Sequence, residues 1–72
     1  MATKKAIQWF KGLTLEQKNE IAEKAGISLG TLRNVFYSRQ KLSIKTVLRV
    51  ENASNKAVTR YQIAPEIDWT VF

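Results

Sequence analysis

The feature that most constrains this chain is a three-residue break, Gly26-Ile27-Ser28, between two segments with helical periodicity. Glycine adopts positive φ without the penalty that a larger residue incurs, and Ser28 is a favourable cap for the helix that follows. A connection this short forces the two helices to cross steeply. The sequence therefore predicts a helix-turn-helix over residues 15–37.

Capping signals predict further helices on both sides of this pair. Residues 4–11 carry apolar side chains on one side and stop at Gly12, and Thr14 opens a Thr-x-x-Gln capping box. Ser43 is another favourable cap, and the apolar stripe that follows it ends near Asn55. Helices are therefore predicted over residues 4–11, 15–25, 29–37 and 44 to about 55.

The C-terminal segment 57–72 is compatible with two structures. Thr59 could cap a short helix that stops before Pro65. The content of Val, Thr, Tyr and Ile and the alternation over residues 67–71 would instead suit a β-hairpin. We favour the short helix, so the predicted fold class is all-α, a compact domain of four to five helices, with the hairpin as the alternative.

The chain is short and uniform in composition. Its 72 residues contain no internal repeat, no low-complexity segment and no linker rich in Ser, Gly or Pro. We expect a single domain over residues 1–72, with 65–72 as an extended tail. Trp9 is expected in the core, whereas Trp69 and the apolar residues after it would either fold back on the domain or form a dimer contact.

The formal charge is +6, and its placement is uneven. No acidic residue occurs between Glu23 and Glu51, whereas six basic residues do. The acidic residues Glu16, Glu20 and Glu23 fall on one face of a helix, which predicts that charges of opposite sign are segregated. A one-sided positive charge suggests a polyanionic partner.

The composition argues against an enzyme. The chain has no cysteine and no histidine, and it shows no nucleophile–base pair or phosphate-cradling glycine loop. We therefore expect no catalytic residue, metal, cofactor or small-molecule substrate. No run of 18 apolar residues and no signal peptide occurs, so the expected location is the cytoplasm, without a membrane partner.

The predicted helix 29–37 has two distinct faces. Leu32, Val35 and Phe36 share one arc and should face the core. The opposite arc carries Gly30, Arg33, Asn34 and Tyr37, with Thr31 beside them. Arginine can contact guanine and asparagine can contact adenine through paired hydrogen bonds in the major groove. The exposed arc is therefore a candidate surface for reading DNA.

The run from Lys18 to Val35 resembles the helix-turn-helix of phage Cro and CI-type repressors. The tail, residues 50–69, resembles the YdaS-like subgroup, whose pattern has an apolar-Glu-x-Ala helix end, a Gly-Gly turn, Ala-Val-Thr-Arg and Leu-Arg-Pro-Asp. Here Asn55-Lys56 replaces Gly-Gly, and Ala64-Pro65-Glu66 replaces Arg-Pro-Asp. The resemblance extends over about residues 4–69.

This resemblance implies roles for individual positions. The base-reading positions of the family match Ser28, Leu29, Gly30, Arg33 and Asn34. The expected phosphate contacts are Lys18, Thr31, Tyr37, Arg39, Gln40, Lys41 and Ser43. Leu29 and Gly30 stand where long polar readers are common, so Leu29 would touch a thymine methyl group and Gly30 would allow close approach.

Together these inferences predict a sequence-specific, double-stranded DNA-binding transcriptional repressor. It would act as a homodimer on a short operator, with the helix 29–37 in the major groove. The alternative is a small basic protein-interaction module, such as an antirepressor or antitoxin, that docks through its apolar C-terminus.

Overall fold

The structure is a computed structural model that describes residues 2–37 and 43–71. These residues form five α-helices, a short 3-10 helix and no strand. The elements are α1 (Lys4–Lys11), α2 (Leu15–Ala25), α3 (Leu29–Tyr37), α4 (Ile44–Ala53), α5 (Arg60–Ile63) and η1 (Trp69–Val71). The all-α prediction is confirmed, and the favoured short helix forms where the hairpin was the alternative.

Local capping explains why these helices begin where they do. The hydroxyl groups of Thr14 and Thr59 each accept the backbone N–H of the glutamine three residues later. The side chain of that glutamine accepts the backbone N–H of the threonine in return, so both form complete capping boxes. Thr3 caps α1 in a simpler way, by accepting the Ala6 N–H at 3.3 Å. Ser43 precedes α4 as predicted, but its side chain makes no capping hydrogen bond.

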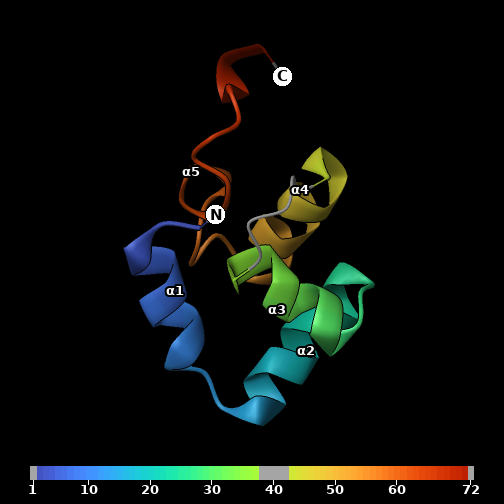
Figure 1. Ribbon diagram of the computed structural model, residues 1–72. Helices are drawn as coiled ribbons and strands as arrows, with labels where there is room; N and C mark the ends of the chain where they lie inside the picture. Colours follow the sequence, from blue (N-terminus) through green and yellow to red (C-terminus); the bar gives the residue numbers. More distant parts are fainter. Residues whose placement is uncertain (1, 38–42, 72) are drawn as a thin grey trace.

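The helices surround one apolar core. α2 packs against α3 and α4, while α1 packs against α3 and α5 (Figure 1). The rings of Phe10 and Phe36 stack within this core with centroids 4.4 Å apart. Trp9 is half-buried against this core, as predicted, and its ring lies 6.0 Å from that of Phe36.

The C-terminal segment folds back through Trp69. Its indole is buried, and its Nε1–H donates to the Ala64 carbonyl at 3.0 Å. Asp68 accepts hydrogen bonds from the hydroxyl and the N–H of Thr70, and these bonds lower the pKa of its carboxyl. Of the two expected fates for Trp69, the structure shows the fold-back; the side chains of residues 71 and 72 lie outside the described part.

A buried ion pair links α4 to α5. Both oxygens of Glu51 are occupied, because Oε2 accepts the Arg60 N–H at 2.8 Å and Oε1 accepts the Arg60 Nε–H at 3.2 Å. The same guanidinium lies 5.7 Å from the centre of the Trp69 ring. The Glu and Arg of the tail pattern therefore hold the C-terminal third of the chain together.

The turn after α4 has two residues in an unfavourable backbone conformation. Asn55 and Lys56 adopt φ of 55° and 62°, and the Lys56 N–H donates to the Glu51 carbonyl at 3.0 Å. This hydrogen bond is characteristic of a Schellman motif, in which the first left-handed residue, here Asn55, is usually glycine. Asparagine tolerates the conformation, but a lysine with a Cβ atom is strained there.

We expect Lys56→Gly to raise the free energy of unfolding by about 0.5–1 kcal/mol, because glycine relieves the positive φ. Chemical denaturation with urea measures the change. Lys56→Ala is the matched control, since it removes the same exposed side chain but keeps the Cβ atom. Equal stability of the two variants would show that the backbone conformation carries no strain.

Candidate nucleic-acid interface

The turn between α2 and α3 depends on Gly26. Its φ is 71°, and a Cβ atom added there would meet no atom within 4 Å, so glycine is needed for its backbone conformation and not for space. The N–H groups of Gly26 and Ile27 donate to the carbonyls of Glu23 and Ala22 at 3.1 and 3.0 Å. These two bonds complete a Schellman motif that ends α2 and redirects the chain into α3.

Ser28 fixes the start of α3. Its Oγ accepts the Thr31 N–H at 3.1 Å and donates to the Thr31 Oγ1 at 2.9 Å. The predicted cap is confirmed. It also joins an expected base-reading residue to an expected phosphate-contacting residue, so these two exposed hydroxyls form one preordered polar group at the start of α3.

The two faces of α3 separate as predicted. Its apolar residues are fully buried, namely Leu32, Val35 and Phe36. Arg33 and Asn34 are exposed, and neither side chain makes a hydrogen bond or ion pair with another described residue. Their donors and acceptors are therefore free to meet a ligand.

The first turn of α3 offers little side-chain chemistry beyond the cap. Leu29 is half-buried against the core, so only part of it is available to a thymine methyl group. Gly30 is exposed, and a Cβ atom there would meet only the Ser28 Oγ, at 3.9 Å. Packing within the chain therefore does not require glycine at this position.

Two of the expected phosphate contacts meet on a shared aromatic ring. The Lys18 Nζ lies 4.7 Å from the centre of the Phe10 ring, and the Tyr37 ring packs edge-on to Phe10 with centroids 5.7 Å apart. The sequence alone does not indicate that Phe10 takes part in this surface. An aromatic residue on an amphipathic helix usually indicates only a buried core position, so the sequence gives little reason to expect a role for Phe10 at the surface.

The remaining expected contacts are less completely described. Ser43 is exposed at the start of α4. The expected contacts Arg39, Gln40 and Lys41, in the basic connector, lie outside the described residues.

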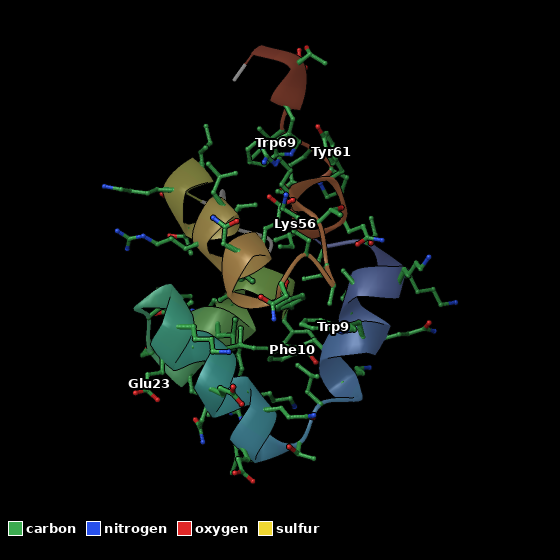
Figure 2. The ribbon with its side chains drawn as sticks, turned by 180° about the vertical axis from the view of Figure 1, so that it is seen from behind. Trp9, Phe10, Glu23, Lys56, Tyr61 and Trp69 are labelled. Carbon is green, nitrogen blue, oxygen red and sulfur yellow. The ribbon has the colours of Figure 1, made fainter. Side chains whose placement is uncertain are left out.

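The acidic side chain of Glu23 does not face this group. It is exposed on α2 and projects away from Phe10 (Figure 2).

Two further features bear on the chemistry available. Within residues 2–37 and 43–71, the acidic residues form no group of three that could hold a metal ion. In the same ranges, the helices are too short and too polar to cross a membrane.

The chain is similar in sequence to a known bacterial protein. The chain is 34% identical, over 59 residues, to a "Prophage transcriptional regulatory protein" of Escherichia coli (strain K12). The alignment includes 82% of this chain and 89% of that protein. No protein-family model and no solved structure matches the chain.

Proposed function

This chain belongs to the family of that prophage transcriptional regulator, and on this premise we propose that it is a Cro-type, YdaS-like repressor that binds a short DNA operator as a homodimer. The observation that carries the proposal is the exposed face of α3. The side chains of Arg33 and Asn34 project from a helix that the Gly26 turn and the Ser28 cap hold in place, and neither side chain has a partner among the described residues. The buried face of the same helix anchors it to the core.

The proposed mechanism is stoichiometric. Cations and hydroxyl groups contact phosphates and set the position of the protein on the duplex, while α3 enters the major groove. There the Arg33 guanidinium would donate to the O6 and N7 of a guanine, and the Asn34 amide would pair with the N6 and N7 of an adenine. Occupancy of promoter DNA by the dimer would then block transcription.

The absence of a side chain at Gly30, on the exposed face of α3, favours this mechanism. Gly30 lies on the same face as Arg33 and Asn34 and adds no side chain between the helix and the groove. Since a glycine costs roughly 0.5–1 kcal/mol relative to alanine inside a helix, its presence here needs a compensating benefit. Close contact between the backbone of α3 and DNA would supply one.

Salt dependence tests the electrostatic part of the proposal. If each subunit neutralises about three or four phosphates, the log–log slope of affinity against salt concentration should be on the order of −6 for the dimer. Fluorescence anisotropy with a labelled duplex at several salt concentrations measures this slope. A flat response would rule out phosphate contacts as the main source of affinity.

A further inference from the structure

The ring of Phe10 contacts two aromatic rings and one ammonium group. Phe36 stacks on it with an interplanar angle of 11° and a centroid distance of 4.4 Å. The Lys18 ammonium lies over the ring, and Tyr37 packs against it at an angle of 69°. Phe10 itself is 1% exposed.

This arrangement joins three helices at the border between core and surface. Phe10 belongs to α1, Lys18 to α2 and Tyr37 to α3. Lys18 is half-buried, whereas Tyr37 is 43% exposed. The aromatic ring approaches the ammonium from one side only, and an ammonium has three N–H donors. The remaining donors can therefore bind an anion while the cation stays on the ring.

We propose that Phe10 is a positioning residue that holds the Lys18 ammonium and the Tyr37 phenol as a two-donor clamp for one DNA backbone phosphate. This inference rests on the proposed function and adds to it a device that preorganises the contact. A free lysine side chain loses much rotamer freedom when it is fixed on a phosphate. A lysine already held on an aromatic ring has lost part of that freedom before binding, so the entropy cost of binding the phosphate is smaller.

The chemistry of the pair fits a phosphate in particular. Lysine binds phosphate as a point charge, and a tyrosine hydroxyl is a common donor to phosphate oxygens. The ion pairs among the described residues involve Lys24 and Arg60, which leaves the Lys18 ammonium unneutralised by a described carboxylate. A phosphate would supply the missing negative charge.

A double-mutant cycle on the intact protein tests the clamp. We expect Lys18→Gln to weaken binding to operator and random duplexes by the same factor and to reduce the salt slope by about 1 per subunit. Phe10→Leu should weaken both by roughly threefold to tenfold, because the Lys18 side chain must then be ordered when it binds the phosphate. In the Lys18→Gln background, Phe10→Leu should cause a clearly smaller further loss, limited to the part that acts through its contact with Tyr37. Lys18→Arg should retain affinity, because a guanidinium also stacks on aromatic rings.

Two controls separate positioning from general destabilisation. Ile63→Val removes one methyl group from a fully buried aliphatic residue of α5 and should leave DNA affinity unchanged at a temperature where all variants are folded. Independently of DNA, the NMR signals of the Lys18 ε-methylene protons should be shifted by the Phe10 ring current and should lose that shift in Phe10→Leu.

The outcomes are distinguishable. Non-additive losses together with the ring-current shift would support the clamp. If the wild-type protein binds DNA but the two losses are additive, or if the ring-current shift is missing, the clamp is wrong and the proposed function stands. Failure of the wild-type protein to bind any duplex would overturn both.

Discussion

Replacing Glu51 with alanine is expected to lower the free energy of unfolding by about 3 kcal/mol. Removing one partner of a buried ion pair costs about 3–5 kcal/mol, and the lower end applies because the Arg60 side chain is one-third exposed. The substitution also leaves the Arg60 N–H without the acceptor that it contacts at 2.8 Å. Thermal unfolding followed by circular dichroism should show a fall in Tm of roughly 15 °C, given the size of the chain.

The chain offers a matched control for this prediction. Glu20 and Lys24 form an ion pair with the same 3.1 Å separation as Glu51 and Arg60, but both of its side chains are more than half exposed. Glu20→Ala should therefore cost no more than about 0.5 kcal/mol. Similar losses for the two alanine variants would show that burial does not determine the strength of the α4–α5 link.

Asn34→Ala is expected to reduce operator affinity by about 1–3 kcal/mol, or roughly 5- to 150-fold, while binding to random duplex changes little. The physical reason is that a base-edge contact exists only on the matching sequence, whereas phosphate contacts exist on every duplex. The exposed position of Asn34 on α3 predicts that folding is unaffected. Competition titrations with operator and random duplexes measure both affinities.

Asn52 provides the comparison for Asn34. It is also an exposed asparagine within a helix, but it lies on α4 and outside the proposed reading face. Asn52→Ala should leave both affinities unchanged. An equal loss on operator and random DNA for Asn34→Ala would show that this residue does not read sequence.

Much of the fold follows from short-range signals in the sequence. The capping boxes at Thr14 and Thr59 and the positive φ at Gly26 each depend on residues within one helical turn, so a linear reading finds them. The same signals set the break between α2 and α3 and the choice of a helix after Thr59. The two faces of α3 follow from helical periodicity alone.

The missed features depend on contacts between separate elements. Glu51 is charged, yet it lies four residues after Val47 on the apolar stripe of α4, and only its contact with Arg60 nine residues later explains its burial. The position of Lys18 over Phe10 likewise depends on how α1 packs beside α2. Periodicity places each residue on a face of its own helix but does not identify its partner on the next.

Selection of bound sequences from a pool of random duplexes tests the central claim most directly. We predict enrichment of an inverted repeat whose half-sites lie about one helical turn apart, as expected for two copies of α3 in successive major grooves. Enrichment should disappear with Asn34→Ala at the positions that this residue reads. Recovery of a pool with no preferred sequence would contradict sequence-specific recognition by this protein.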